Sequence, residues 1–293
     1  MRSGSRSSSP RTRTTGPDRS APVSLAKETN YRFALVRSSP DGTRVLYSAF
    51  PWNGLARAWM VDARGSQSTA VGPSGLACFF AGISPDNSRA FVAAFQDHSR
   101  KTPGRLIAHR LGDGASSDLT DLPPGSSHWT CSRDCGLVAF HGDFDGRRRV
   151  YIKDTATGST RVIASGSEEV GFPVFSRDNK WISVEVRGRI AGGNDIGIAP
   201  ANGGPLQVLL RSDEPAYASG WMPDNDRVLF AGFRDGVWNA YTISRTTKKV
   251  ERLTSYDSPR TYVRYIDWLA GDRIVYEFNE TKGNIFVVDI SDR

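Results

Sequence analysis

The feature that most constrains the fold of this chain is a sequence unit that occurs six times at nearly constant spacing. In each unit a tight polar turn precedes a short apolar run, as in Ser39 to Arg44 followed by Val45 to Phe50. The steps between equivalent positions are 45, 47, 44, 47 and 46 residues, and these positions are Arg44, Arg89, Gly136, Lys180, Arg227 and Arg273. A period of this size, filled with turns and strand-forming residues, is typical of a propeller that has one blade per repeat. The spacing therefore predicts an all-β, six-bladed β-propeller.

Each repeat is long enough for four antiparallel strands, which we name A to D in chain order. In the fifth repeat these strands are expected at 218–221, 228–233, 237–243 and 250–254. Pro223-Asp224-Asn225 forms the first turn, because proline presets φ and asparagine accepts the left-handed conformation of a tight hairpin. The B strands are apolar on both faces, which suits a sheet packed between two neighbouring blades.

The sixth repeat is incomplete at the sequence level. Its B and C strands are expected at 274–278 and 284–290, and too few residues follow to form a D strand. The segment 22–26 lies at the right distance before the first repeat to supply that strand. An unpaired sheet edge at this place would be a template for aggregation. We therefore predict that an N-terminal strand at 22–26 completes the sixth blade and closes the ring.

Composition separates residues 1–21 from the rest of the chain. The first 20 residues hold five arginines, one aspartate and no apolar run, so we expect 1–21 to be a disordered Ser/Thr/Arg-rich tail. This tail accounts for +4 of the net charge of +7, and the predicted propeller, residues 22–293, is only weakly basic. A weakly basic body does not indicate a nucleic-acid groove, so no specific nucleic-acid partner is expected.

The hydropathy pattern contains no membrane segment. The longest apolar stretch, 76–83, has eight residues, whereas about 20 are needed to span a bilayer. The N-terminal residues also lack the apolar core of a secretory signal, so the sequence as written predicts a cytoplasmic location. A start further upstream would allow a periplasmic or other extracytoplasmic location. We expect a monomer.

The three cysteines are odd in number and do not indicate a disulfide framework. Cys131 and Cys135 flank one tight turn, and a hairpin brings their Cα atoms within bonding range if the compartment is oxidising. Cys78 is interpreted as a small buried hydrophobic residue.

Several segments resemble the WD40-like repeat (PD40) of TolB-type six-bladed propellers. They are Trp221-Met222-Pro223-Asp224-Asn225, Phe175-Ser176-Arg177-Asp178-Asn179, Asp195 to Gly204, and Glu251-Arg252-Leu253-Thr254 with the stretch from Trp268 to Asp289. The resemblance covers about residues 22–293. Because the matching residues form turns and core, the resemblance implies the fold of a six-bladed TolB-type propeller. It also implies, as an expectation, a binding module like the TolB propeller. Propellers of this type also occur attached to bacterial regulators, which implies a second interpretation, a detached sensory domain.

The loops that join strand D to strand A and strand B to strand C lie on one face of a propeller. They carry residues suited to contact with a protein or peptide, because aromatic and arginine side chains dominate binding energy at interfaces. These residues are Trp52, Arg100, Glu169, Tyr217, Arg234, Arg260 and Tyr262. We expect the partner to bind at this rim or at the mouth of the central channel.

Histidines on the same face support an alternative hypothesis. His98, His128 and His141 are expected on adjacent blades, with Asp143 nearby, and together they would supply ligands for a divalent metal. Some propeller lyases of the wider family use a histidine-rich metal centre, so the resemblance implies a metal-dependent, carbohydrate lyase-like enzyme. No HxH or HExxH spacing forces these histidines together.

Other catalytic patterns are weak. Asp143-Phe144-Asp145-Gly146 resembles the start of a calcium loop, but it falls where a B–C hairpin turn is expected. There is no G-x-S-x-G motif for a serine nucleophile. We therefore assign no catalytic residue and no cofactor. The sequence favours a non-enzymatic protein- or peptide-binding propeller, with the metal-dependent enzyme as the alternative.

Overall fold

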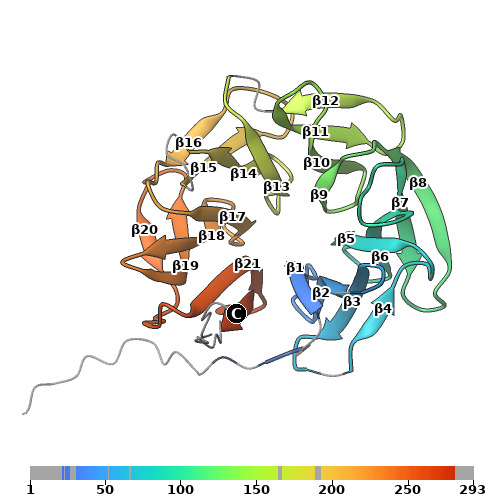
Figure 1. The fold of residues 1–293 in the computed structure, drawn as a ribbon, viewed down its shortest axis with the longest axis horizontal. Helices are drawn as coiled ribbons and strands as arrows, with labels where there is room; N and C mark the ends of the chain where they lie inside the picture. The colour runs from blue at the N-terminus through green and yellow to red at the C-terminus, as the bar shows by residue number, and fades with distance from the viewer. Residues whose placement is uncertain are drawn as a thin grey trace, which may run out of the picture.

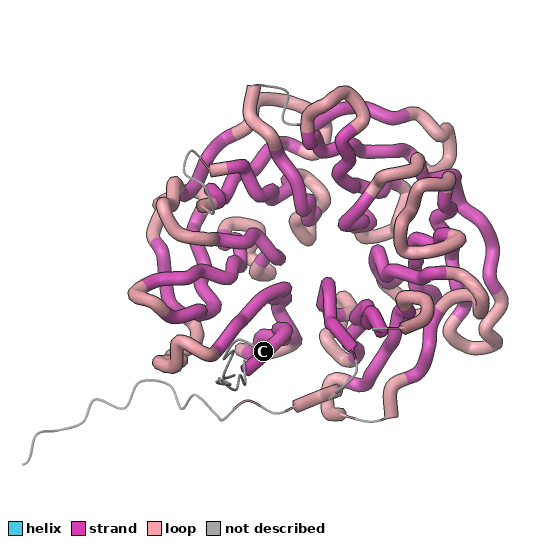
Figure 2. The backbone as a smooth tube through the Cα atoms, in the orientation of Figure 1, coloured by secondary structure: helices cyan, strands magenta, loops and turns pink. Residues whose placement is uncertain are grey.

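The computed structural model describes residues 22, 24–26, 31–51, 53–65, 67–163, 167–188 and 193–280. These residues form 22 β-strands and no helix. The sheets are arranged around a central axis like the blades of a propeller, and the last strands lie beside the first ones (Figure 1). The tube in Figure 2 shows the innermost strand of each sheet around the middle, with loops at the edges. The chain is therefore an all-β propeller with antiparallel blades.

Five sheets contain four antiparallel strands each. The first two are β1 (Tyr31–Ser38), β2 (Arg44–Pro51), β3 (Arg57–Asp62), β4 (Thr69–Val71), and β5 (Ala77–Ile83), β6 (Arg89–Phe95), β7 (Gly104–Arg110), β8 (Ser116–Leu122). The next two are β9 (Ser127–Cys131), β10 (Leu137–Asp143), β11 (Arg148–Asp154), β12 (Thr160–Ile163), and β13 (Val170–Phe175), β14 (Trp181–Arg187), β15 (Asn194–Pro200), β16 (Gln207–Leu210). The fifth is β17 (Ala216–Trp221), β18 (Arg227–Arg234), β19 (Val237–Ser244), β20 (Val250–Arg252).

The described residues form five complete blades rather than the six that the repeat predicts. The sixth repeat forms a sheet of two strands, β21 (Thr261–Leu269) and β22 (Arg273–Glu280). The segment 284–290, expected as its next strand, lies outside the described residues. The described part of the expected closing strand, residues 22 and 24–26, is not in a strand. Proline at position 22 has no N–H to donate to a ladder, and Leu25 and Ala26 instead pack against the core shared by β1, β2 and β21.

A repeated hydrogen-bond pattern explains why the turn between strands A and B has the same shape in most blades. In the first blade Ser39 Oγ donates to Asp41 Oδ1 at 2.6 Å, and Arg44 N donates to Ser39 Oγ at 2.9 Å. The second, third and fourth blades repeat this pattern from Ser84, Ser132 and Ser176. A serine at the start and an aspartate two residues later satisfy the backbone locally, so the turn forms from its own sequence.

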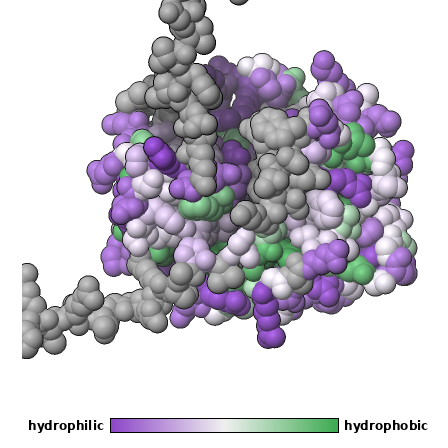
Figure 3. All heavy atoms as spheres, turned by 60° about the horizontal axis from the view of Figure 1, so that its bottom comes forward, coloured by the Kyte–Doolittle hydropathy of each residue, from purple (hydrophilic) through white to green (hydrophobic). Residues whose placement is uncertain are grey.

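The core lies between neighbouring sheets. The B strands β2, β6, β14 and β18 are buried along most of their length, since both faces contact an adjacent blade. Large side chains such as Phe80, Phe140, Trp221 and Phe230 are fully buried there. Among the described residues, the exposed large hydrophobic side chains are Phe144, Val162 and Phe278. The surface view in Figure 3 accordingly shows separate hydrophobic areas among mostly hydrophilic ones.

The ring closes where the first sheet meets the last. Ser38 N and Ser38 Oγ donate to Asp267 Oδ2 at 2.9 and 3.1 Å, and both side chains are buried. In the adjoining turns, Gly42 has φ +68°, and a Cβ atom there would lie 2.3 Å from Ala270 Cβ and from Ala270 N. Only a glycine allows the two turns to approach this closely. We call the contact of Ser38 and Gly42 with Asp267 and Ala270 the seam.

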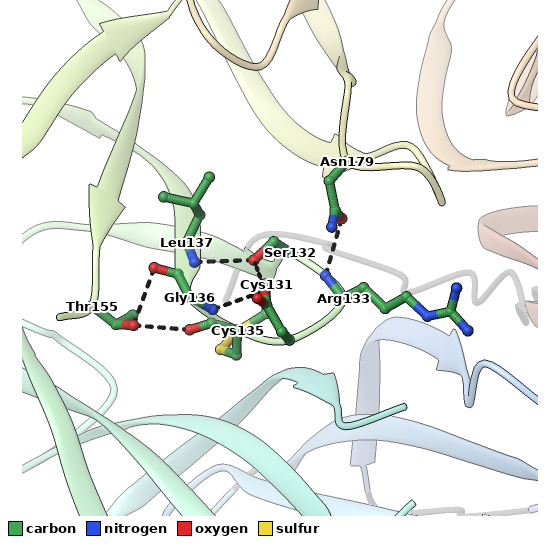
Figure 4. The surroundings of a disulfide bond; sticks show 9 residues. Cys131, Ser132, Arg133, Cys135, Gly136, Leu137, Thr155 and Asn179 are labelled. Carbon is green, nitrogen blue, oxygen red and sulfur yellow. Dashed lines mark hydrogen bonds between the residues drawn. A yellow bond between two sulfur atoms is a disulfide. The ribbon is translucent and has the colours of Figure 1, made fainter. Parts of the chain in front are cut away.

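Cys131 and Cys135 form a disulfide with Cα atoms 4.7 Å apart (Figure 4). The bond spans the turn between β9 and β10, as the hairpin hypothesis required. Cys78 is fully buried, and burial raises the pKa of its thiol to about 11. Among the described residues, no helix has the length and apolar character needed to cross a membrane.

The close contact at the seam predicts that a methyl group added at Gly42 destabilises the fold more than one added at another glycine with positive φ. Gly42→Ala should lower the free energy of unfolding by about 3 kcal/mol, because strain at positive φ adds to the collision with Ala270. Gly65→Ala is the matched control: Gly65 has φ +84° but open space at its Cβ position, so the strain alone should cost about 1 kcal/mol. Urea unfolding of both variants measures the difference. Equal losses would show that the seam does not constrain Gly42.

The disulfide should stabilise the fold modestly because it closes a loop of only a few residues. The double variant Cys131→Ser, Cys135→Ser should lose about 2 kcal/mol of unfolding free energy. It should still fold, since the hydrogen bonds of Ser132 with Asp134 and Leu137 form the turn without the bond. Calorimetry with and without dithiothreitol checks this: reductant should lower the Tm of the wild type to that of the variant and leave the variant unchanged. A reductant effect on the variant would contradict the assignment.

Candidate functional site

A register shift in every innermost strand directs side chains into the channel. The A strands β1, β5, β9, β13, β17 and β21 each pair with the following strand through a ladder that shifts register once. At four of these shifts a non-glycine residue has positive φ, and these residues are Leu35, His128, Phe172 and Tyr265. Bulges of this kind re-aim a side chain, and left-handed non-glycine residues are uncommon. Three of these four residues, His128, Phe172 and Tyr265, carry a ring at this position near the centre of the propeller.

Three of the blades bring aromatic or imidazole rings into contact. The His128 ring centroid lies 4.0 Å from that of Phe172, 4.9 Å from His141 and 6.5 Å from Tyr265. His128 and His141 belong to the third sheet, Phe172 to the fourth and Tyr265 to the last. We call these four residues the central ring cluster. It joins strands on opposite sides of the ring.

Both histidines of the central ring cluster are held neutral. Phe172 N donates to His141 Nδ1 at 2.9 Å, so that nitrogen carries no proton and the neutral ring has its proton on Nε2. Burial lowers the pKa of His141 to about 3, and the charges of Arg148 and Arg100 add to this effect. Burial also lowers the pKa of His128 well below its usual range, with His141 and the nearby arginines as further causes. Neither ring contributes a positive charge at neutral pH.

Three arginines surround the cluster. The Arg264 guanidinium lies 4.2 Å from the Tyr265 ring centroid, and its Nε is 3.2 Å from a Glu277 carboxylate oxygen. Arg148 lies over Phe172 at 5.8 Å, and Arg100 lies over Phe79 at 5.7 Å.

The side chains of Arg100 and Arg148 each have one hydrogen-bond donor without a partner among the described residues. The Nε atom of each is buried and has no hydrogen-bond partner within the described part of the chain. A buried donor without a partner costs about 1–3 kcal/mol and needs an explanation, such as a water or a ligand.

Glu185, on β14, does not offset the positive charge of these arginines. It is 2% exposed, and the described residues give it no hydrogen bond or ion pair. Burial raises the pKa of its carboxyl to about 8, although Arg148 and Arg264 act in the opposite direction. At neutral pH the group is therefore mostly protonated. The site combines the guanidinium groups of Arg100, Arg148 and Arg264 with the carboxylate of Glu277, and the Glu169 carboxylate, which pairs with Arg187, also acts on Arg148. Guanidinium groups therefore outnumber carboxylates here.

Three of the rim residues predicted from the sequence border this site. Arg100 is part of it. Tyr217 stacks on Trp238 with centroids 5.3 Å apart, and the Trp238 ring meets Tyr262 edge-on at 4.9 Å. Burial raises the pKa of Tyr217, and the neighbouring Tyr262 and Glu185 act in the same direction. The structure thus brings Arg100, Tyr217 and Tyr262 to one end of the channel.

The other predicted rim residues lie apart from the cluster. Glu169 forms an ion pair with Arg187, and that hydrogen bond holds the pKa of the Glu169 carboxyl below its usual range. Arg234 lies over the Tyr241 ring at 5.1 Å, within its own blade. Arg260 is exposed at the turn before β21. Trp52 lies outside the described residues.

The candidate metal ligands are only partly brought together. His128 and His141 are neighbours, but His98 is exposed in the loop between β6 and β7, and Asp143 is exposed at the end of β10. In the portion of the chain that the structure describes, no three His, Cys, Asp or Glu side chains are grouped so as to hold a metal ion. Asp143 to Gly146 leads into the hairpin between β10 and β11, as predicted.

Sequence reasoning missed much of the site. The missed residues are Arg148, Phe172, Glu185, Arg264, Tyr265 and Glu277. One signal was present: His128, Phe172 and Tyr265 each lie eight residues before the repeated turn positions Gly136, Lys180 and Arg273. A repeat position that holds a ring in three units of six indicates a common location near the axis. The charged residues near these rings, such as Arg148, Glu185 and Arg264, recur at no common position of the repeat and leave no such signal.

Comparison with known proteins supports the fold. No family model matches the chain, and no curated protein sequence matches it. TolB from Acinetobacter baumannii aligns with a TM-score of 0.62 and 17% identity, over 77% of this chain and 55% of that chain. A TolB-type protein from Agrobacterium tumefaciens aligns with a TM-score of 0.60 and 20% identity, over 76% and 81%. An oligogalacturonate lyase in complex with manganese aligns with a TM-score of 0.54 and 16% identity, over 78% and 69%.

At these identities the likeness establishes the fold alone, and that fold is a TolB-like β-propeller. The aligned part spans about half the length of the A. baumannii protein.

The raised pKa of Glu185 predicts a pH-dependent stability. A group whose pKa is about 8 in the folded state and 4.5 otherwise stabilises the fold at low pH, and this contribution is lost as pH rises towards 8. Glu185→Gln, which stays neutral, should therefore gain stability relative to the wild type by about 1 kcal/mol per pH unit between pH 5 and 8. Glu168→Gln is the control, because Glu168 is exposed. Thermal melts of all three proteins across this range test the prediction, and parallel curves for wild type and Glu185→Gln would contradict it.

Proposed function

We propose that this chain is a non-enzymatic binding module for a protein or a peptide, with its partner held at the end of the channel that carries the D–A and B–C loops. The observation that carries the proposal is the pair of buried Nε donors on Arg100 and Arg148 that lack hydrogen-bond partners among the described residues. A bound carboxylate would satisfy them with charge-assisted hydrogen bonds, which are stronger than neutral ones. An acidic peptide segment supplies such a group.

The surroundings of these arginines favour a peptide over a reacting substrate. Tyr217, Trp238 and Tyr262 provide amphipathic rings of the kind that anchor binding interfaces. His141 is a poor general base at neutral pH, because its pKa is about 3 and its Nδ1 already accepts a backbone hydrogen bond. The charge excess and the rings together match an acidic peptide that contains an apolar or aromatic residue.

The binding module is proposed in a six-bladed form. The two strands β21 and β22 already occupy the place of a sixth blade between β17 and β1. The segments expected to complete this blade are 284–290, which lies outside the described residues, and 22–26. Leu25 and Ala26, which pack on the core of the first sheet, support the N-terminal contribution.

The alternative function is a metal-dependent enzyme related in fold to oligogalacturonate lyase, centred on His98, His128, His141 and Asp143. Its support is the contact of His128 with His141. Elemental analysis of purified protein separates the two proposals, because stoichiometric manganese, zinc or calcium retained through dialysis would favour the enzyme. A detached sensory domain of a larger regulator is compatible with the same binding end.

The test of the proposed function is peptide selection on the immobilised protein. A random peptide library should yield acidic sequences that contain an aromatic residue, and fluorescence anisotropy should give their dissociation constants. Arg148→Gln should weaken binding at least tenfold, because a charge-assisted hydrogen bond to a buried donor is worth about 1.5–3 kcal/mol.

The matched control is Arg147→Gln, which removes the same charge from an adjacent exposed side chain. This variant should bind within twofold of the wild type, and circular dichroism should show both variants folded. Selection of no peptide, or equal weakening by the two substitutions, would contradict the proposed function.

A further inference from the structure

A cavity lies at the end of the channel opposite the proposed peptide site. It has a volume of about 490 Å³ and is lined by residues at the ends of the A strands of all six sheets and by the A–B turns of four of them. Along β9, β13 and β21 the central ring cluster precedes the cavity residues, so the rings stand between the two ends. We call this cavity the turn-face pocket. Its volume lies in the range of small-molecule sites.

Three arginines and two aspartates line the turn-face pocket. Both aspartates already have partners in the fold. Asp267 accepts hydrogen bonds from Ser38 and is 3.3 Å from Arg177 Nη2. Asp178 accepts from Ser176 Oγ and from Lys180 N in the same turn, as the corresponding aspartates do in other blades. Of the three arginines, Arg177 is thus paired with Asp267 and also lies over the Trp268 ring at 4.8 Å.

The other two arginines, Arg37 and Arg133, have no ion pair among the described residues. The Arg37 guanidinium donates to the carbonyl of its neighbour Val36 at 3.0 Å. Arg133 uses its backbone N–H to bind Asn179 Oδ1 at 3.0 Å, while its side chain extends away from the disulfide turn (Figure 4). Both side chains line the pocket. Burial lowers the pKa of Arg37, which fits a guanidinium held away from water, but arginine stays charged in proteins.

The lining of the pocket combines polar side chains with an apolar patch. Ala81, Val174 and Phe175 line the pocket from the second and fourth sheets. Thr130, on β9, adds a hydroxyl. A cavity lined by two guanidinium groups without an ion pair and by an apolar patch matches a compact molecule that has an anionic group at one end and a hydrophobic body.

We propose that the turn-face pocket is a second binding site, for a small organic oxyanion whose carboxylate or phosphate lies between Arg37 and Arg133 and whose apolar body contacts Val174 and Phe175. Arginine forms bidentate hydrogen bonds to either oxyanion. This site is independent of the peptide site proposed above, because it shares no arginine with that site and lies at the other end of the channel.

The test uses probes with one ring and one charged group. Isothermal titration calorimetry with benzoate and with phenylphosphate should give saturable binding at one site, and phenyltrimethylammonium, which has the opposite charge, should not bind. Inorganic phosphate should bind at least tenfold more weakly than phenylphosphate, because it lacks the apolar body. The ratio between benzoate and phenylphosphate distinguishes a carboxylate ligand from a phosphate ligand.

Arg133→Gln should weaken binding of the preferred probe at least tenfold, and Arg133→Lys should restore part of it. Arg133 is exposed and makes no side-chain contact that the turn needs, so both variants should keep the wild-type Tm. Arg147→Gln is the charge-matched control and should leave the affinity unchanged. Absence of saturable binding of both ring anions up to 20 mM, equal affinity in Arg133→Gln, or equal binding of the cation would overturn the proposal.

Discussion

The arrangement of the whole ring depends on the seam between its first and last sheets, because every other pair of neighbouring blades is joined by a short stretch of chain. At the seam Asp267 accepts two hydrogen bonds from Ser38 and pairs with Arg177, which comes from the fourth blade. These bonds are directional and buried, so sliding of one sheet against the other would leave polar groups unpaired at about 1–3 kcal/mol each. The close contact of Gly42 with Ala270 fixes the adjoining turns in the same register.

The register shifts of the A strands bring side chains of different sheets together only because the ring is closed. Each shift turns one side chain towards the axis, and only a closed ring places His128 opposite Tyr265. The rings then separate the channel into two ends with different chemistry. One end has aromatic side chains and arginines over the central ring cluster, and the other is the turn-face pocket.

The two ends share an excess of positive charge that the small net charge of the body does not reveal. Burial neutralises His128, His141 and Glu185, because each of these groups has a pKa close enough to neutrality to be shifted across it. The guanidinium group of arginine has too high a pKa to lose its proton in the same surroundings. Burial therefore removes charge selectively and leaves buried arginines such as Arg100 and Arg37 as cations in need of an anion.

The sequence by itself determined the sheets of this protein. The period placed the strands of the fifth blade within two residues of their observed ends, because the turn at Asp224 and the apolar run after it depend on local backbone chemistry. It did not determine how the last repeat is completed: its described residues form a sheet of two strands, and the described part of 22–26 packs by side chains without forming a strand. Only the tertiary structure decided the site. Arg148, Glu185 and Arg264 lie on three different sheets, and the protonation of Glu185 depends on burial and on charges that are remote in sequence.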